Sequence, residues 1–389
     1  MNSTLRHLDE RLAWRTLPEL AQQVIDHALS IQAIPAPTFH EHQRAQFIAE
    51  RFTTLGLQQV ETDEQRNVYG LIPGENHDRA LMLTAHTDTV FPADTDLTPR
   101  FEDDLIYGPG LGDNSIGVAA LLGLAEFLNE QRITPVCDLW LVANTQEEGL
   151  GNLSGMKAAF LRLQDRIQAV INIEGMALGH VYCAGIAVRR LHITAQAEGG
   201  HSWLNFGRPS AVHGLIEIGA RILAIQPPTA PRTTYNIGII EGGQSINTIA
   251  AKAGLWLDLR SEDARALEQL EQQVRQLVEA AARPGLTLQA RVVGDRPAGA
   301  ISADHRLVQI ALQALERVGI QGTLESGSTD ANVPLAAGCP AVTIGVTRGG
   351  NAHRLDEYIE TAPIASGIRH LILTVLTAAN MTQLVSSHA

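Results

Sequence analysis

Short apolar runs that end at a histidine or a carboxylate recur through the first half of the chain. The runs at 80–85, 138–144 and 169–172 are followed closely by His86, by Glu147 and Glu148, and by Glu174. Helical periodicity fills the stretches at about 115–130 and 153–164, so strands alternate with helices. This alternation predicts an α/β fold with a mostly parallel sheet. Ligands bind beyond the carboxyl ends of the strands in such sheets, and these side chains fall there.

The sequence pattern changes near Val188 and changes back near residue 301. Between these points we expect four alternating strands and two helices, at about 211–224 and 262–282, in a compact antiparallel unit of about 110 residues. Patterns of the first kind return at 304–318, 341–344 and 361–379. The sequence therefore predicts a catalytic domain formed by 1–186 and 297–389, with an α+β lid and dimerisation domain inserted at 187–296.

Charge and cysteine content argue against several classes of partner and compartment. The net charge of −13 disfavours nucleic acid and anionic membranes, because both recruit basic patches. Three cysteines without metal-type spacing fit reduced thiols in a cytoplasm. The N-terminal stretch is charged throughout and has no apolar signal segment. The longest apolar run, at 117–128, is interrupted by Glu126, so we expect no membrane span.

His86 and Asp88 lie two positions apart at a strand end, a spacing that lets both side chains point the same way. A metal-bound imidazole usually needs a carboxylate or carbonyl on its second nitrogen, which Asp88 could provide. The alternative is a surface turn without a ligand. Asp113 follows the glycine-rich segment at 108–112 and precedes a helix, so it could bind metal or simply cap that helix. The segment lacks the register of a dinucleotide-binding loop.

Glu147 and Glu148 are adjacent, so their side chains diverge and should serve different purposes. Two carboxylates at a buried strand end repel one another unless a cation is present. The alternative is favourable placement of acids in the first turn of a helix. Glu174 and His353 could each be structural, although His353 follows two glycines in a loop that could approach a ligand closely. Imidazoles and carboxylates at strand ends suit hard or borderline divalent metal ions.

In this order and context, the residues resemble the dinuclear zinc peptidases and deacylases that include acetylornithine deacetylase, succinyl-diaminopimelate desuccinylase, glutamate carboxypeptidase and tripeptide aminopeptidase. The resemblance covers nearly the whole chain, including the inserted lid. It implies two divalent metal ions, with zinc expected first and cobalt or manganese as alternatives. The implied roles are His86 and Glu174 on one ion, Glu148 and His353 on the other, Asp113 bridging both, Asp88 orienting His86, and Glu147 as general base. It also implies a cis peptide between Asp113 and Asn114.

The lid carries its own resemblance to this family. The element at 199–202, Gly-Gly-His-Ser, is similar to one whose histidine, here His201, reaches the partner subunit's site and stabilises the tetrahedral intermediate. Asn247 and Arg260 resemble lid residues that hold a substrate carboxylate, a contact that suits arginine. The alternatives are a strand-end histidine and ordinary solvated strand side chains. Trp203 departs from the family, in which a small residue usually follows this element.

These residues together predict hydrolysis of an amide bond in a small peptide or N-acyl amino acid. Two cations would polarise the scissile carbonyl and activate a water, from which Glu147 would take a proton. A deacylase and a peptidase remain alternatives within this class, and a family-shaped binding protein without turnover is the alternative outside it. We further expect a homodimer formed through the lid, and no nucleic-acid or membrane partner.

Overall fold

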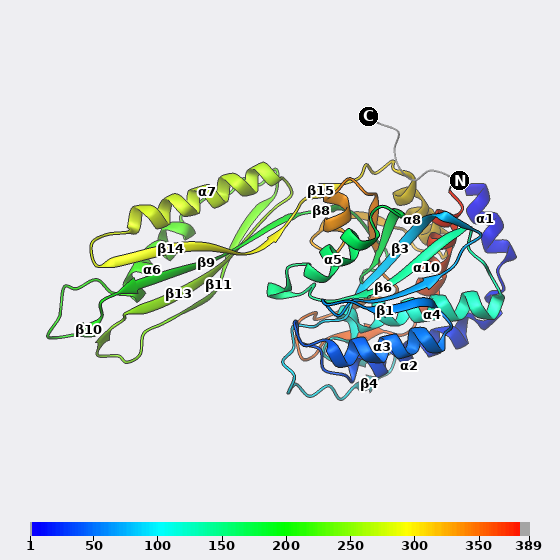
Figure 1. The fold of residues 1–389 in the computed structure, drawn as a ribbon, viewed down its shortest axis with the longest axis horizontal. Helices are drawn as coiled ribbons and strands as arrows, with labels where there is room; N and C mark the ends of the chain where they lie inside the picture. The colour runs from blue at the N-terminus through cyan, green and yellow to red at the C-terminus, as the bar shows by residue number, and fades with distance from the viewer. Residues whose placement is uncertain (1, 382–389) are drawn as a thin grey trace. The chain divides into compact units, whose positions relative to one another are not determined.

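The computed structural model describes residues 2–381, which form two compact units (Figure 1). Of the described residues, 2–185 and 299–381 form unit 1, and 186–298 form unit 2. The domain boundaries expected from the sequence, 186/187 and 296/297, fall one and two residues from these changeover points.

The central sheet of unit 1 has nine strands in the order β1-β2-β6-β3-β7-β17-β8-β15, with β16 paired to β8. β3 runs parallel to β6 and β7, and β17 runs parallel to β7, so the middle of the sheet is parallel. The strands are β1 Gln58–Thr62, β2 Val68–Ile72, β3 Asn76–His86, β6 Cys137–Asn144, β7 Ile167–Ile173, β8 His180–Gly185, β15 Gly299–Ala300, β16 Thr323–Gly327 and β17 Ala341–Ile344. The predicted α/β class is therefore confirmed.

Helices cover both faces of this sheet. They are α1 Asn2–Arg11, α2 Leu17–Gln32, α3 His42–Thr54, α4 Ile116–Gln131, α5 Ser154–Leu163, α8 Arg306–Arg317, α9 Asn332–Ala336 and α10 Ile364–Ala379, with short turns η1 Trp14–Thr16, η2 Leu111–Ser115 and η3 Gly149–Gly151. Along β3, Leu81 and Leu83 join the core formed with α2, α4 and α10, whereas Met82 joins the core under α5 and α9. Because every residue of β6 and β7 is buried, only the strand ends are open to function.

No uninterrupted apolar run reaches the length of a membrane span, because Glu126 interrupts the longest one. The longer stretch Leu111–Gln131 is apolar enough on average to cross a membrane, but 89% of its apolar window is buried inside the fold. Its interrupting charge, Glu126, lies 2.8 Å from His27 of α2 through Oε1 and Nε2. We therefore interpret this stretch as a core helix of unit 1.

Several short elements escape sequence-based prediction because they lack a periodic pattern. A four-stranded sheet, in the order β18-β19-β5-β4, joins two segments that lie about 250 residues apart. Its strands are β4 Arg100–Glu102, β5 Leu105–Tyr107, β18 Gly349–Gly350 and β19 Tyr358–Glu360. This small sheet matters for the site because it positions the loop that carries His353.

Unit 2 has the predicted four-stranded antiparallel sheet, in the order β11-β13-β9-β14, with two helices on one face. Its elements are β9 Ala187–Ala197, β10 Gly200–His201, α6 Ala211–Leu223, β11 Thr233–Gly242, β12 Thr248–Ile249, β13 Lys252–Ser261, α7 Ala264–Ala281 and β14 Leu286–Arg296. Leu191 and Ile193 point into the core beneath the helices, whereas the intervening His192 points to the open face. The two edges of this sheet are β11 and β14.

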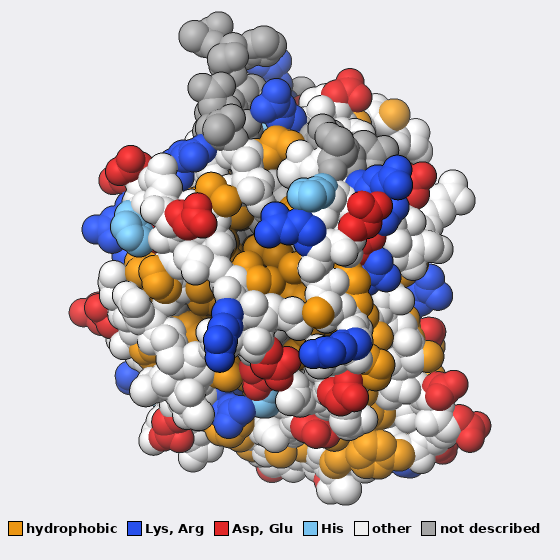
Figure 2. All heavy atoms as spheres, turned by 90° about the vertical axis from the view of Figure 1, so that its right-hand side faces the viewer, with side chains coloured by type: hydrophobic (Ala, Val, Ile, Leu, Met, Phe, Trp, Pro, Cys, Tyr) orange, Lys and Arg blue, Asp and Glu red, His pale blue; other side chains and the backbone are white. Residues whose placement is uncertain are grey.

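Figure 2 shows one face of the molecule, on which acidic and basic side chains are interspersed and not gathered by sign.

The described residues contain three free cysteines, Cys137, Cys183 and Cys339. The first two are buried, which raises their thiol pKa values above the usual range. These thiols are therefore poorly placed for redox chemistry.

His370 provides a pH-dependent contribution to the stability of unit 1. It is fully buried on α10, with Nε2 3.2 Å from the carbonyl oxygen of Ala311 on α8. Burial lowers its pKa to about 4. Unfolded histidine, with a pKa near 6.5, takes up a proton first as the pH falls. The free energy of unfolding should therefore decrease between about pH 6.5 and about pH 4, and level off on either side.

The substitution His370→Gln removes this titration while keeping an amide that can donate to Ala311. Between about pH 7 and about pH 4, we expect the wild-type protein to lose about 3 kcal/mol more unfolding free energy than the variant. Urea unfolding at a series of pH values measures the difference. The exposed His7→Gln serves as a matched control and should follow the wild type. Parallel curves for His370→Gln and wild type would show that His370 is not the source.

Candidate metal centre

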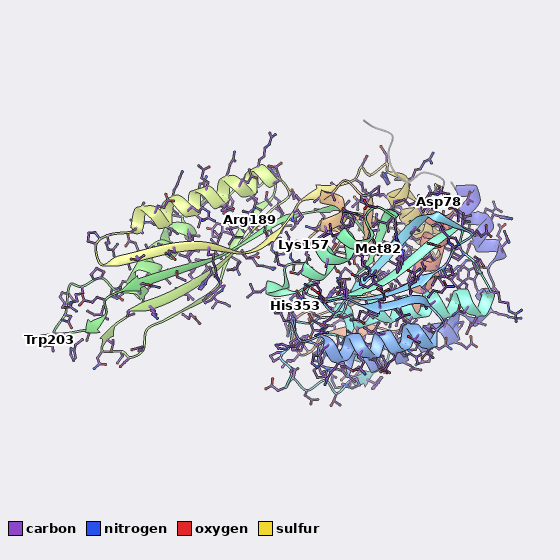
Figure 3. All side chains as sticks on the ribbon, in the orientation of Figure 1. Asp78, Met82, Lys157, Arg189, Trp203 and His353 are labelled. Atoms are coloured by element: carbon purple, nitrogen blue, oxygen red, sulfur yellow. The ribbon has the colours of Figure 1, made fainter. Side chains whose placement is uncertain are left out.

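The structure brings together six residues predicted from the sequence: His86, Asp113, Glu147, Glu148, Glu174 and His353. Four of them stand at or just after the carboxyl ends of β3, β6 and β7, as expected for a parallel sheet. In Figure 3, His353 lies at this end of the sheet, whereas Asp78, near the start of β3, lies at the other. The cluster is therefore a product of strand order and not of sequence proximity.

The Asp113 carboxylate lies between two imidazoles. Its Oδ1 is 3.0 Å from Nε2 of His86, and its Oδ2 is 3.1 Å from Nε2 of His353. The peptide between Asp113 and Asn114 is cis, as predicted. Asn114 donates through Nδ2 to the carbonyl oxygen of Ile173 at 2.7 Å, which ties this turn to the end of β7. A carboxylate that presents a different oxygen to each side is suited to bridging two cations.

Two groups of ligand atoms share Asp113. Atoms of His86, Asp113 and Glu174 lie within 4.8 Å of one another, and so do atoms of Asp113, Glu148 and His353. Glu148 Oε1 is 2.9 Å from Nε2 of His353, and Glu174 Oε2 is 3.6 Å from Nε2 of His86. Both groups combine imidazole nitrogen with carboxylate oxygen, a donor set that suits divalent ions such as zinc, cobalt or manganese. These residues thus fit two adjoining cation sites.

Glu147 belongs to a third group of the same kind, with His86 and Glu148. Its side chain is only 7% exposed, so it faces the cluster from within the fold. The geometry is compatible with a ligand as well as with a base beside the ligands. A substitution that keeps its size separates the two roles.

Negative charge dominates the cluster and shifts its pKa values. Burial raises the pKa of Glu148 to about 7, against a hydrogen bond from His353 that lowers it. Burial also raises the pKa of Glu174. Hydrogen bonds to Asp113 and Glu148 raise the pKa of His353 to about 10. Burial lowers the pKa of His86, but Glu174 and Asp113 outweigh it and hold that pKa well above its usual value. The site therefore attracts positive charge.

Asp88 has a role that sequence analysis does not predict. Its Oδ1 and Oδ2 accept the backbone N–H groups of Glu147 and Glu148, each at 2.9 Å, and Oδ2 also accepts the Thr38 hydroxyl at 2.8 Å. Toward His86, the backbone carbonyl oxygen of Asp88 is 3.1 Å from Nδ1, closer than Oδ1 at 3.6 Å. Asp88 thus faces His86 mainly through its backbone, and its carboxylate fixes the turn that carries both glutamates.

Glu357 also lies behind the cluster and is missed by sequence analysis. It is fully buried, and its Oε1 accepts the N–H groups of Gly112 at 2.8 Å and Asp113 at 3.0 Å. Its Oε2 accepts the N–H of His353, a residue with a φ of 67°, at 3.3 Å. Burial and repulsion from Asp113 raise its pKa to about 7. The available signal was an acid four residues after His353, in HRLDE.

Asp330 is a second acid that sequence analysis misses. It is fully buried, and its Oδ2 accepts a hydrogen bond from Nδ2 of Asn144, at the end of β6, at 2.6 Å. Burial and repulsion from Glu147 raise its pKa well above the usual value. Because it follows β16 in an irregular segment, no periodic pattern marks it.

The other three predicted residues lie in unit 2. His201 is exposed on β10, which pairs with β12, and its Nδ1 accepts the backbone N–H groups of Trp203 at 3.2 Å and Leu204 at 3.4 Å. The carbonyl oxygen of Asn247 accepts the N–H of Ser202 at 3.0 Å, so the Asn247 turn lies beside this element. Figure 3 shows Trp203 at the tip of its loop.

Arg260 already has a carboxylate partner. Its Nε donates to Oδ2 of Asp258 at 2.6 Å, while Oδ1 of Asp258 accepts from Nε of Arg190 at 3.1 Å. Two guanidinium groups therefore share one carboxylate on the open face of the sheet. A substrate carboxylate at Arg260 would have to share or replace that contact.

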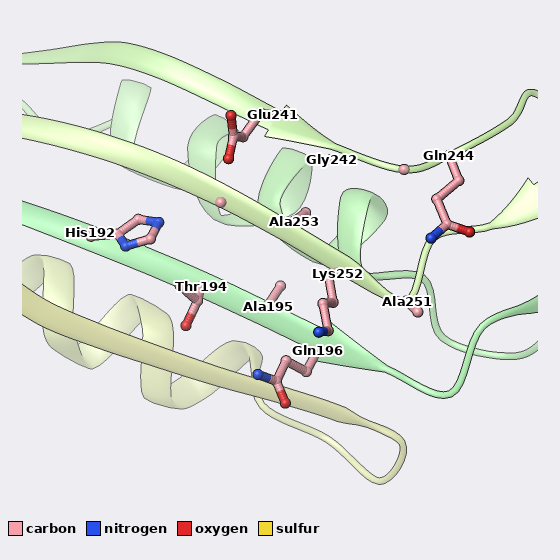
Figure 4. Close-up of a pocket in the computed structure, with 12 residues that line it drawn as sticks. His192, Thr194, Ala195, Gln196, Glu241, Gly242, Gln244, Ala251, Lys252 and Ala253 are labelled. Carbon is pink, nitrogen blue, oxygen red and sulfur yellow. The ribbon is translucent and has the colours of Figure 1, made fainter.

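Two surface pockets differ in whether residues next to the metal cluster line them. The larger, about 590 Å³, lies on the open face of the unit 2 sheet and is lined by His192, Thr194, Gln196 and Lys252, among others (Figure 4). It contains none of the six cluster residues. The second, about 530 Å³, is lined in part by Gly108, Pro109 and Leu355, on the segments that lead to Asp113 and follow His353. The second pocket is the better candidate for substrate binding, because these segments carry two of the cluster residues.

Comparison with known proteins agrees with this geometry. The family described as peptidase family M20/M25/M40 matches residues 82–377. Succinyl-diaminopimelate desuccinylase of Corynebacterium glutamicum is 28% identical over 349 residues, covering 87% of this chain and 90% of that protein. Carboxypeptidase G2 of a Pseudomonas species is 27% identical, covering 77% and 73% respectively. A tripeptidase structure from Staphylococcus aureus shares the fold, with a TM-score of 0.77, 22% identity, and coverage of 93% and 99%.

Glu357 provides a test of how the cluster is held. Glu357→Ala leaves three backbone N–H groups without their acceptor, so Asp113 and His353 should lose their fixed positions. We expect affinity for added Co²⁺ to fall at least tenfold, as for other residues that support metal ligands. Titration followed by visible absorption measures this affinity, and thermal unfolding of the metal-free protein is recorded alongside.

Glu357→Gln keeps one acceptor oxygen and should recover part of the affinity. The exposed Glu316→Ala is the control for loss of one acid from unit 1. Unchanged Co²⁺ affinity in folded Glu357→Ala would mean that Asp113 and His353 hold their positions without Glu357.

Proposed function

This chain belongs to peptidase family M20/M25/M40, and we propose that it hydrolyses an amide bond in a small peptide or N-acyl amino acid with the help of two bound divalent ions. The observation that carries the proposal is the Asp113 carboxylate, whose two oxygens face His86 and His353 at 3.0 and 3.1 Å. We assign His86 and Glu174 to one ion, Glu148 and His353 to the other, and Asp113 to both. Zinc is the first expectation, and cobalt or manganese would suit the same donors.

When bound, the ions would supply Lewis acidity at the scissile carbonyl and at the attacking water. Glu147 is assigned as the general base, which takes a proton from that water and delivers it to the leaving amine. Its backbone N–H is held by Asp88 at 2.9 Å, so its carboxylate is positioned by the fold. The bond that breaks is the amide C–N bond, and the products are an acid and an amine.

His201 is assigned to stabilisation of the oxyanion. Its Nδ1 accepts two backbone N–H groups, so the proton of the neutral imidazole belongs on Nε2. An exposed Nε2–H is the donor that an oxyanion needs. Asn247 and Arg260 are assigned to the substrate carboxylate, with Asp258 as the competing partner of Arg260.

We propose a homodimer through unit 2, and its exposed apolar edge supports this proposal. β11 is an edge strand, and Ile239 and Ile240 are each 55% exposed on it. On α6, Ile216 is 55% exposed and Leu223 is 64% exposed. Edge strands and exposed apolar side chains are natural pairing surfaces, and a symmetric dimer is the commonest closed assembly. In this dimer we propose that His201 of one subunit serves the site of the other.

The relatives include both a desuccinylase and a carboxypeptidase, so a deacylase remains the alternative to a peptidase. The family match and the hydrolase relatives leave the alternative of a binding protein without support. We further propose a cytoplasmic location, in keeping with three free cysteines. A panel of dipeptides and N-acyl amino acids, assayed with added zinc, cobalt or manganese, distinguishes the two activities.

The role of Glu147 can be separated from that of a ligand. We expect wild-type protein and Glu147→Gln, each reconstituted with zinc, to bind two ions per chain by elemental analysis. Turnover of the variant should fall at least about 100-fold, because a positioned acid–base group contributes that much. Exposed Glu130→Gln is the matched control and should retain full turnover. One ion or none in the wild type contradicts the dinuclear site, and loss of an ion only in Glu147→Gln makes Glu147 a ligand.

The composite site predicts complementation between two inactive subunits. His201→Ala should lose turnover and keep its metal, as should Glu147→Gln. In a co-expressed and verified heterodimer of these two variants, one of the two composite sites contains both native residues, so part of the activity should return. Absence of recovery in that heterodimer, or full activity of a monomeric protein, would rule out action of His201 across the interface.

A further inference from the structure

Among the residues that the structure describes, unit 1 exposes seven large hydrophobic side chains, and four of them lie one or two positions along the chain from a residue that belongs to the site or hydrogen-bonds to it. Among its described residues they are Phe39, Val90, Phe101, Leu150, Leu161, Leu324 and Leu355. Val90, Leu150 and Leu355 each lie two positions after a residue of the site, namely Asp88, Glu148 and His353. Phe39 follows Thr38, whose hydroxyl donates to Asp88. We refer to Phe39, Val90, Leu150 and Leu355 as the apolar rim.

Chain geometry keeps the rim close to the cluster. Two Cα steps span at most about 7 Å, so three rim residues begin within that distance of a site residue. The segments that carry Phe39 and Val90 also run side by side, because the N–H of Thr38 donates to the carbonyl oxygen of Thr89 at 3.3 Å and the N–H of Thr89 donates to that of Ala36 at 2.9 Å. Leu355 additionally lines the pocket of about 530 Å³, which also contains the charged side chains of Asp96, Arg100 and Asp356. The rim thus comes from four segments anchored at one site.

Phe39 stands out for its backbone as well as for its exposure. Its φ is 75°, a conformation that bulky residues rarely adopt, and 56% of the residue is exposed. The N–H of Phe39 donates to Oε1 of the buried Glu41 at 2.9 Å, which helps to hold the conformation. An aromatic ring kept in solvent at the cost of backbone strain is typical of functional positions.

From the rim we infer the substrate class: the group next to the scissile amide is apolar, an aliphatic or aromatic acyl group or side chain, and not a second carboxylate. Apolar side chains anchored beside the site give such a group a surface that removes part of it from water. They offer no hydrogen-bond donor to a charged group, which would lose its hydration on entering. Each methylene transferred from water to the rim should raise kcat/KM about fourfold. This inference rests on the proposed function.

The test is a matched substrate series with the zinc-reconstituted, full-length enzyme. N-butanoyl-alanine and N-succinyl-alanine have acyl chains of the same length and differ in charge, and N-acetyl-alanine is the short reference. A second series compares N-acetyl-leucine with N-acetyl-aspartate. We expect the apolar member to exceed the charged one at least about tenfold in kcat/KM in one series. A preference for the apolar member of less than about tenfold in both series, or a preference for the charged member, overturns the inference and leaves the proposed function intact. Absence of any hydrolysis removes the proposed function, and the inference with it.

Rim variants test the assignment to these residues. Leu150→Ser and Leu355→Ser should each lower the butanoyl-to-acetyl ratio of kcat/KM several-fold, because part of the apolar surface is lost. Leu161→Ser is the matched control, since Leu161 is 70% exposed on α5 and is not part of the rim. Metal content is measured for every variant. An unchanged ratio in both rim variants, with wild-type metal content, shows that the rim does not select the substrate.

Discussion

Several carboxylates meet at one edge of a buried sheet, and their mutual repulsion is the constraint on which the rest of unit 1 depends. The fold meets it in two ways. Asp88 and Glu357, which stand behind the site, are compensated by backbone N–H groups that fix them in place. Asp113 and Glu148, which face the site, are balanced by imidazoles. The acids that accept backbone N–H groups fix the shape of the site. The acids that face imidazoles can replace the positive charge of a protonated imidazole with that of a metal ion.

The sequence predicts those parts of this arrangement that lie on helices and strands with a regular pattern of apolar residues. β3, β6 and β7 each contain a short, mostly apolar stretch near their carboxyl end, so the sequence predicts these ends, and with them His86, Glu148 and Glu174. The predicted elements of unit 2 follow from alternation and helical spacing in the same way. Glu357 and Asp330 were missed because they lie in irregular segments whose positions depend on pairing between strands far apart in the chain. The dominant role of the Asp88 carboxylate depends on a turn geometry that no residue pattern encodes.

The two sheets make different surfaces available. In unit 1 the central strands are buried on both faces, so chemistry is confined to strand ends and the loops that follow them. In unit 2 only one face is covered by helices, so polar side chains stand along the whole length of the other. The pocket in Figure 4 and the pair of guanidinium groups at Asp258 both lie on that open face. This difference in packing confines the acidic cluster to strand ends in unit 1 and leaves a whole polar sheet face open in unit 2.

The insertion of unit 2 also sets a sequence of events during synthesis. His86, Asp113, Glu148 and Glu174 leave the ribosome before the insertion, whereas His353 and Glu357 follow it. β17, which pairs with β7, also follows it, so the sheet of unit 1 waits for about 110 further residues. Domains generally fold as units during translation, so unit 2 can fold while unit 1 is still incomplete. The nascent chain therefore carries most of the proposed metal ligands before the sheet that positions them is complete. The site can form only after the segment with β17, His353 and Glu357 has left the ribosome.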